Sequence, residues 1–337
     1  MKDLFIDVKR RKRYLFALGM ILFMIGVAEW LGEKEIIFPE MAALTIGMWI
    51  VDKRVWRIKR WQLVILMTIG AVAGVCIVRY SIFPLIINLG IAFMFTAICL
   101  LFSRTTLIPQ ISACMLPVLL KTESWVYPVA VFVMSLIIVT GQKFMERYSI
   151  RQKIVFEPDE RHWKKDAGVW LGLLFSILLI ASLAIYTNNY YFIIPPLIVT
   201  YVEFVNSKAG FRNRPMQIVL LMVSASLVGT VFQIVGHYYL HLPEWVVALF
   251  IFMVLFTVFE RIGKFFAPVG ALALIPMIVP EEGLVWMPLQ VAVGAILFIT
   301  TALVVFQRCY KWSKAQLVYC LTPEYLRNKL HNNKEAE

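Results

Sequence analysis

The sequence predicts an all-α polytopic membrane protein with about twelve transmembrane segments, arranged as two parallel six-segment repeats, some of them short and broken by proline. The chain is 61% hydrophobic and 16% charged, whereas soluble domains are about 45–50% apolar and about 25% charged. Apolar runs recur along nearly its whole length, which is typical of a protein that crosses a membrane many times. A third observation, an internal repeat, is described below.

Twelve apolar segments follow one another along the chain. The first comes after the basic stretch MKDLFIDVKRRKRYLFALGM, and no small-residue cleavage site follows it, so we expect a membrane helix that is retained. The second, fifth, eighth, tenth and eleventh segments are shorter than the roughly 20 residues of a full crossing. The segments are 14–31, 36–51, 61–79, 85–102, 107–120, 126–144, 168–187, 190–205, 216–236, 244–259, 265–279 and 286–306.

The distribution of basic residues predicts the orientation. If the N-terminus is cytoplasmic, twelve crossings also place the C-terminus in the cytoplasm, and only Lys34, Arg79 and Lys121 of the 33 Lys and Arg residues face the other side. This asymmetry follows the positive-inside rule for a cell membrane. The net charge of +12 therefore indicates topology and contact with anionic lipid headgroups on the cytoplasmic face. We expect no nucleic-acid partner.

The two halves of the chain resemble each other. WQLVILMTIGAVAG (61–74) aligns with MQIVLLMVSASLVG (216–229) at an offset of 155, and the offset becomes 159 after a four-residue insertion. We interpret this as a duplicated six-segment unit whose even number of crossings makes the repeats parallel. Matching residues include Thr45/Thr200, Gln62/Gln217, Gly74/Gly229, Pro84/Pro243, Pro109/Pro268 and Pro117/Pro276. The predicted regions are a first repeat (1–144), a cytoplasmic linker (145–167), a second repeat (168–306) and a cytoplasmic tail (307–337).

Two short segments with matching prolines, TLIPQISACMLPVLLKTES (106–124) and FFAPVGALALIPMIVPEEG (265–283), occupy equivalent places in the repeats. Short, interrupted segments at matching positions point to a transport site, because their freed backbone groups need protein or water as partners. A helix that starts at depth also favours an anion at its N-terminus. The alternative is a pair of kinked helices packed through small residues such as Gly270 and Ala271. We expect a break or kink near Pro268 or Pro276, with Gly270 against solute or against the eighth segment.

A family resemblance rests on these motifs. FAPVGALALIP (266–276), with WMPLQVAVGAILFITTALVVF (286–306), resembles the signature end of the HPP family of integral membrane proteins. IIPPLIVTYVEFVNSKAGFRNRPMQIVLLMVSASLVG (193–229) resembles its earlier region, although Phe266 and Ala267 stand where that family has His and its first Pro. The duplication is also similar to the fusaric-acid-resistance and aromatic acid exporter families. These resemblances imply transport of small anions, nitrite in the first case and aromatic carboxylates in the others.

Ionisable residues within the apolar segments are candidates for proton coupling, because charge is costly in a bilayer. Glu40 and Glu203 are the two candidates. The alternatives are an interfacial acid near Glu33 and Glu35 for Glu40, and an ion pair with Lys208 or Arg212 for Glu203. Candidate substrate-binding residues, which could instead bond between helices, are Thr45, Thr200, Gln62, Gln217, Pro109, Gln110, Pro268 and Gly270.

The sequence contains no motif of a soluble catalyst. It has no phosphate loop or nucleophile elbow, and its five cysteines show no metal-ligand spacing. We therefore expect no enzymatic activity, cofactor or metal. The expected function is a secondary transporter or permease of a small anion, an organic carboxylate or an inorganic anion, with proton coupling. The alternative is a non-transporting membrane scaffold or partner subunit, and the oligomeric state stays open.

Overall fold

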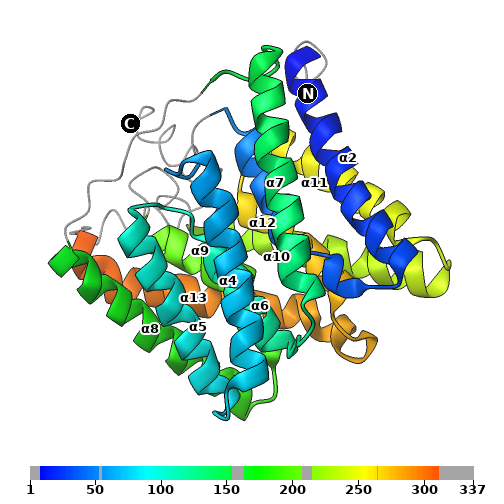
Figure 1. The fold of residues 1–337 in the computed structure, drawn as a ribbon. Helices are drawn as coiled ribbons and strands as arrows, with labels where there is room; N and C mark the ends of the chain where they lie inside the picture. Colours follow the sequence, from blue (N-terminus) through cyan, green and yellow to red (C-terminus); the bar gives the residue numbers. More distant parts are fainter. Residues whose placement is uncertain (1–7, 53–54, 154–162, 207–214, 264, 311–337) are drawn as a thin grey trace, which may run out of the picture.

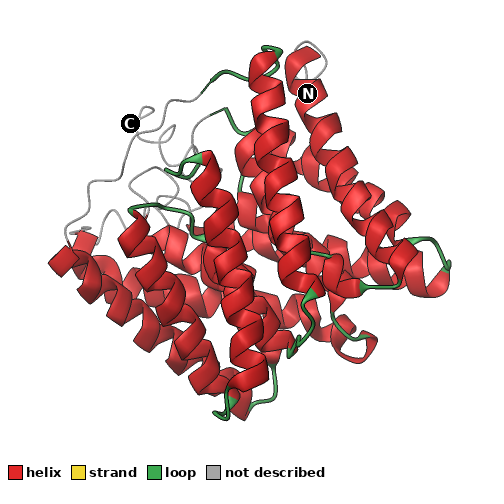
Figure 2. Ribbon diagram, viewed as in Figure 1, coloured by secondary structure: helices red, strands yellow, loops and turns green. Residues whose placement is uncertain are grey.

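The computed structural model describes residues 8–52, 55–153, 163–206, 215–263 and 265–310. These residues form helices joined by short loops, with no strand among them (Figure 2). Eight helices in this part of the chain are long and apolar enough to cross a membrane. They are α2 (Val8–Leu31), α4 (Arg60–Tyr80), α5 (Leu85–Ser103), α7 (Val126–Arg147), α8 (Trp163–Tyr186), α10 (Pro215–Phe232) with η4 (Gln233–Tyr239), α11 (Glu244–Ile262), and α13 (Met287–Tyr310) preceded by η5 (Glu281–Trp286).

Shorter helices take the places of the second, fifth, eighth and eleventh predicted segments. The prediction that the tenth segment is short is wrong, because α11 has 19 residues and continues past Phe259 through Glu260 and Arg261. These two charged residues end the apolar run, so a prediction from apolar runs alone stopped before them. The shorter elements are η1 (Lys34–Ile36), α3 (Glu40–Thr45) continued by η2 (Ile46–Ile50), α6 (Pro109–Leu120), η3 (Tyr190–Ile193), α9 (Pro195–Asn206) and α12 (Ala267–Ile278).

Proline sets the start of the four short α-helices. Pro39 precedes α3, Pro109 and Pro195 begin α6 and α9, and Pro268 is the second residue of α12. Proline suits a first helical turn because the N–H it lacks would have no helical partner there. Residues before α12 are extended, so the break expected near Pro268 is the start of the helix, while Pro276 lies inside it.

The short helices form the centre of the bundle and the long helices surround them. Every residue of α12 except Ile278 is buried. The long helices instead expose large apolar side chains, such as Phe102, Phe175 and Leu220, on their outer faces. Apolar surface of this extent suits a lipid environment. The architecture is that of a polytopic helical membrane protein.

Helices of the first half of the chain pack against helices of the second half. Helix α2 lies against α11 and α8 lies against α5, at opposite sides of the bundle (Figure 1). In the centre, α3 packs against α12 and α6 against α9. The bounds of these long helices are evenly spaced: α8 begins and ends 155 residues after α2, and α11 begins and ends 159 residues after α5. The central short helices therefore meet where the halves join.

Candidate functional site

Glu40, the first residue of α3, is a buried carboxyl group with an open oxygen. Its side chain is 1% exposed. Ser112 of α6 donates a hydrogen bond to Oε1, whereas Oε2 has no hydrogen-bond partner among the described residues. None of the ion pairs formed within the described residues includes Glu40. Burying such a group is costly unless something binds it, so Glu40 is a candidate binding group.

A small cavity lies beside Glu40 at the meeting point of the four central helices. Its free volume is about 10 Å³, roughly the space that one water molecule needs. The second, fifth, eighth and eleventh predicted segments each contribute two residues to its wall. The lining residues are Glu40 and Ala43 of α3, Pro109 and Ser112 of α6, Pro196 and Val199 of α9, and Pro268 and Ala271 of α12.

The residues that line the cavity occur in pairs from the two halves. Pro109 corresponds to Pro268 and Ser112 to Ala271 at the offset of 159. Glu40 and Ala43 are one position out of register with Pro196 and Val199, because the offset of 155 that aligns Thr45 with Thr200 pairs them with Pro195 and Ile198. The four central helices thus contribute equally to the wall in number but not in chemistry. Its carboxyl group and its hydroxyl group both come from the first half.

The N-terminal turns of four short helices surround this space. Glu40 and Pro109 are the first residues of α3 and α6, and Pro196 and Pro268 are the second residues of α9 and α12. Helix N-termini carry a partial positive charge and unpaired N–H groups. Because four of them converge, the centre of the bundle favours a negative charge, either the carboxylate of Glu40 or an anion.

Glycines allow the central helices to approach closely. A Cβ atom added at Gly270 would lie 2.4 Å from Cδ1 of Ile46 and 3.4 Å from the backbone of Ala42. Gly270 therefore packs against α3 and η2, which belong to the second segment, and not against the eighth segment or a solute. A methyl group at this position would displace the end of the Ile46 side chain, whereas its distance from the backbone of Ala42 is an ordinary van der Waals contact.

The two candidate threonines are satisfied by their own helices. The hydroxyl of Thr45 lies 3.0 Å from the carbonyl of Met41 and 2.9 Å from that of Ala42. The hydroxyl of Thr200 donates to the carbonyl of Pro196 at 2.7 Å. Neither residue lines the cavity. Their position near it follows from helix packing, and their hydrogen atoms are already in use.

The two candidate glutamines, Gln62 and Gln217, lie on long helices and do not line the cavity. Gln62 accepts a hydrogen bond from the backbone of Lys59 at 3.2 Å and so caps the start of α4. Gln217 is the third residue of α10, at the corresponding end. The structure does not bring either side chain to the central helices' meeting point.

Gln110 is buried on another face of α6. Its side chain lies against Gly70 of α4, because a Cβ atom there would be 3.2 Å from its Cγ. Both amide atoms are buried without a hydrogen bond of normal geometry among the described residues, although the Cys99 thiol of α5 lies close to the side chain. Gln110 is thus next to the site residues in sequence but separated from the cavity by the width of its helix.

Glu203 lies two helical turns from Pro196, toward the C-terminal end of α9. Trp56, in the loop before α4, donates its indole N–H to Oε1 of Glu203 at 3.0 Å. The ring of Trp56 also covers Gly47, where an added Cβ atom would lie 2.5 Å from it. The expected alternative partners, Lys208 and Arg212, lie outside the described residues. Glu203 thus joins the second half to a loop of the first.

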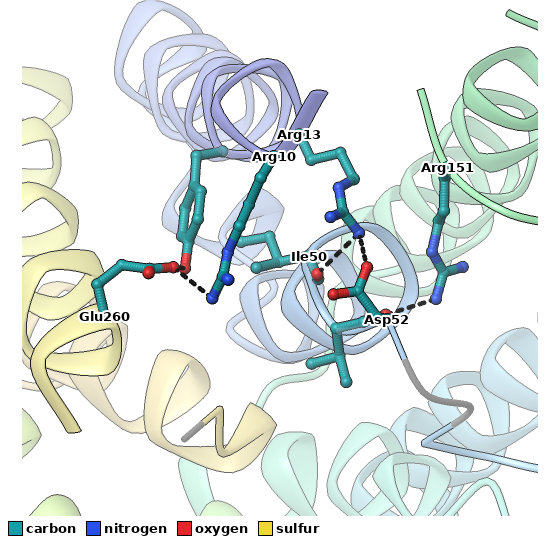
Figure 3. A network of polar contacts seen from close by, with 8 residues as sticks. Arg10, Arg13, Ile50, Asp52, Arg151 and Glu260 are labelled. Atoms are coloured by element: carbon teal, nitrogen blue, oxygen red, sulfur yellow. Dashed lines mark hydrogen bonds and ion pairs between the residues drawn. The ribbon is translucent and has the colours of Figure 1, made fainter. Parts of the chain in front are cut away.

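A cluster of charged residues holds the C-terminal end of η2 (Figure 3). Arg13 of α2 donates to the carbonyl of Ile50 at 3.1 Å and pairs with Asp52, while Arg151 donates to the carbonyl of Val51 at 2.7 Å. Both arginines are at least 95% buried. They satisfy carbonyls that the helix end leaves without partners, and so they fix the C-terminal end of the second predicted segment.

The same cluster joins α2 to α11. Arg10 pairs with Glu260 at 2.8 Å, and the hydroxyl of Tyr14 donates to the same carboxylate (Figure 3). Burial lowers the pKa of Arg151 to about 10, and the neighbouring Arg13 also lowers it, while Glu146 and Asp52 act in the opposite direction. Arg151 still carries its charge at neutral pH. These contacts hold α2, α11 and the end of η2 together at one end of the bundle.

Some residues around the site were not on the list of candidates from the sequence. Ser112, which binds Glu40, is the fourth residue of a short proline-started helix, and its hydroxyl in an otherwise apolar segment is the signal that pointed to it. Arg13 is the last of five consecutive basic residues that precede the apolar part of α2, so the sequence does not distinguish it from its neighbours. Trp56 gives no such signal, since aromatic residues are common at a membrane interface.

Together, the fold and this site define a class: a polytopic helical membrane protein with a buried carboxyl group among central half-length helices. No family model, curated protein or solved structure matches the chain.

Proposed function

We propose that the chain is a secondary transporter of a small anion, coupled to protons, and that anion and proton share the cavity beside Glu40. One observation carries the proposal: the N-terminal turns of four short helices meet at a buried carboxyl group with an open oxygen. The site attracts negative charge and already contains a titratable carboxyl group. It is therefore suited to hold the carboxylate when that group is deprotonated and a solute anion when it is protonated.

The coupling follows from competition at the site. A deprotonated Glu40 places its own negative charge among the helix N-termini and repels a second anion. A protonated Glu40 leaves that region open to a solute anion, so proton and anion bind together. The expected mode is therefore symport, in which an acidic compartment drives uptake of the anion from the same side.

Transport requires that the cavity open alternately to each side, since it has room for about one water molecule in the form described. The contacts that close its cytoplasmic side are those of Arg10, Arg13 and Arg151, which hold α2, α11 and the end of η2 together. We propose that these contacts separate in the inward-open form, and that the halves rock against each other around the central helices.

We also propose twelve crossings, because the short segments connect opposite ends of the long helices. Before α6, Thr106 and Arg57 exchange hydrogen bonds at 2.8 and 3.4 Å beside the start of α4. After α6, Trp125 lies 5.6 Å from the guanidinium of Arg79 at the end of α4. Twelve helical residues span only about 18 Å, and extended residues at both ends complete the crossing.

The proposed twelve crossings arise from duplication of a six-segment unit. The even spacing of the helices and the matched packing of α2 on α11 and α8 on α5 support it. In this arrangement both termini are cytoplasmic in the cell membrane, where basic loops meet anionic lipid headgroups.

The test is solute flux into proteoliposomes, with and without a pH gradient. The family resemblances choose the first solutes: nitrite, a benzoate-type acid and an aliphatic carboxylate. We expect at least one to be taken up faster when the outside is acidic, and Glu40→Gln to remove that dependence on the gradient. Glu203→Gln is the matched control, because Glu203 lies outside the cavity and already has a partner in Trp56.

The alternative function is a scaffold or partner subunit that does not transport. The tightness of the cavity favours it, since no solute fits without movement of the helices. Flux of none of the solutes through correctly inserted protein would support this alternative. Flux that is equally dependent on the gradient in Glu40→Gln would instead keep transport but remove Glu40 from the mechanism.

A further inference from the structure

A row of buried polar side chains runs along one face of α10 into η4. Ser226, Thr230 and Gln233 are spaced by four and three residues, so they share a helix face. They are at most 3% exposed, and their hydroxyl oxygens and both amide atoms have no hydrogen-bond partner among the described residues. Hydroxyls in a helix commonly bond to a carbonyl one turn back, as those of Thr68 and Ser176 do here. Those of Ser226 and Thr230 do not.

The first half of the chain shows that helix packing does not require this row. At the offset of 155, its counterparts on α4 are Ala71, Val75 and Val78, all apolar. Yet the two helix pairs pack alike. An added Cβ atom at Gly74 would meet the carbonyl of Cys114 and the ring of Pro117, and one at Gly229 would meet the carbonyl of Ala273 and the ring of Pro276. The polar row is therefore an addition to a shared packing arrangement.

A backbone carbonyl of the neighbouring helix α12 lacks its helical donor. Proline inside a helix deprives the carbonyl four residues earlier of its donor, so Pro117 frees Ala113 and Pro276 frees Leu272. In the first half, the hydroxyl of Tyr127 donates to the freed carbonyl at 3.1 Å. The counterpart of Tyr127 is Trp286, whose side chain is 62% exposed. In the second half, the freed carbonyl thus lacks the tyrosine and lies on the helix that packs against α10.

The surroundings of this row favour a positive charge. The C-terminal end of α12, which carries a partial negative charge, lies on the same side of the membrane as η4. Glu281 and Glu282 follow it and line an outer pocket that contains no basic residue. That pocket also includes Ile234, which directly follows Gln233. The last residue of the polar row is therefore adjacent in the chain to a residue that lines this acidic pocket.

We propose that Ser226, Thr230 and Gln233 hold a monovalent metal cation between α10 and α12, and that sodium is the ion to test. Neutral hydroxyl, amide and freed backbone oxygens are ligands for such ions in membrane transporters. A divalent ion would require carboxylates, and a proton would require a titratable group. The site is separate from the Glu40 cavity, because Ala271 faces the cavity whereas Ala273 faces α10 on the other side of α12.

The experiment is thermal unfolding of the purified full chain in nanodiscs, with sodium chloride exchanged for choline chloride at constant ionic strength. We expect the unfolding temperature to rise saturably by several degrees with sodium, because a ligand that binds only the folded state stabilises it. The decisive variant carries the residues of the first half: Ser226→Ala, Thr230→Val and Gln233→Val together. It should remain folded in choline and lose the sodium shift.

Matched variants separate this site from a general effect of salt. Ser224→Ala lies on the same helix, but its hydroxyl already bonds to the carbonyl of Leu221, so the sodium shift should stay. If the triple variant does not fold, Thr230→Val should lose the shift and Thr230→Ser should keep it. Glu40→Gln should keep it whether or not the chain transports an anion. No sodium shift in the unmodified chain, or an unchanged shift in the triple variant, overturns the proposal.

Discussion

The two halves of the molecule share a way of packing and differ in where they place polar groups. In both, a glycine of a long helix lies against a proline of a short one, Gly74 against Pro117 and Gly229 against Pro276. The polar groups are divided: Glu40 and Ser112 come from the first half, whereas the row beginning at Ser226 belongs to the second. The comparison teaches that backbone contact maintains the architecture, and that each half is free to carry different chemistry on it.

The largest expected effect tests the shared packing. Gly74→Ala and Gly229→Ala would place a methyl carbon 2.3 Å from the carbonyl oxygen of Cys114 and 2.4 Å from that of Ala273. Both contacts are with backbone, so the helices must move apart, at a cost of about 1–3 kcal/mol or more. Unfolding of both variants in detergent should show losses of similar size. Gly19→Ala, with nothing within 4 Å, should lose no stability.

A second prediction concerns a contact that only the first half has. Arg13 binds the carbonyl of Ile50, whereas its counterpart at the offset of 155 is Gly168. Arg13→Met should reduce stability by about 1.5 kcal/mol, the value of a hydrogen bond to a charged group, because the partner Asp52 is largely exposed and adds little. The measurement is unfolding beside Lys12→Met, an exposed neighbour. Equal stability of the two variants would show that the inner end of η2 does not need this contact.

A third prediction tests whether the two halves contribute differently to the cavity. Ser112→Ala removes the hydrogen bond that favours the charged form of Glu40. Glu40 should then accept its proton more readily, so the pH of half-maximal uptake should rise by about one unit, since a bond to a charged group is worth about 1.5–3 kcal/mol. Ala271→Ser, at the matching position of the second half, is the control and should leave the pH profile in place. A profile that moves equally in both variants would argue against the asymmetry.

The smallest expected effect is a pattern of thiol labelling, which involves no change in stability. Parallel repeats place equivalent loops on one side of the membrane, and inverted repeats place them on opposite sides. Lys121→Cys and Glu281→Cys, at the outer ends of α6 and α12, should both react with an impermeant thiol reagent from outside, and Lys59→Cys should not. The reverse pattern would reverse the orientation, and reaction of Lys121→Cys alone would break the parallel relation.

Much of the fold follows from the sequence, because a membrane sets the length of a crossing helix and the charge of the loops on each side. The long helices and the short central segments appear as apolar runs, and the prolines mark where α6 and α12 begin. Among the candidates, Glu40, Pro109 and Pro268 do line one cavity. Their selection had a physical basis, since a carboxyl group or a proline in an apolar segment needs a compensating environment.

The rest depends on side-chain directions that a linear pattern does not contain. Gln110 is adjacent to Pro109 but faces α4, because successive residues of a helix point about 100° apart. Thr45 and Thr200 match between the halves, yet their hydroxyls bond to their own helices. The contact of Trp56 with Glu203 joins residues 147 positions apart, and only the tertiary fold brings them together.

The packing of α2 against α11 also has a consequence in time. Tyr14 and its partner Glu260 are separated by 246 residues, which a ribosome adding about 5–20 residues per second takes roughly 12–50 s to synthesise. For that period the face of α2 that will bind α11, including its basic residues, has only lipid, water or another protein to cover it. The chain therefore depends during its synthesis on a membrane environment that tolerates an unfinished first helix, and its final closure waits for the second half to arrive.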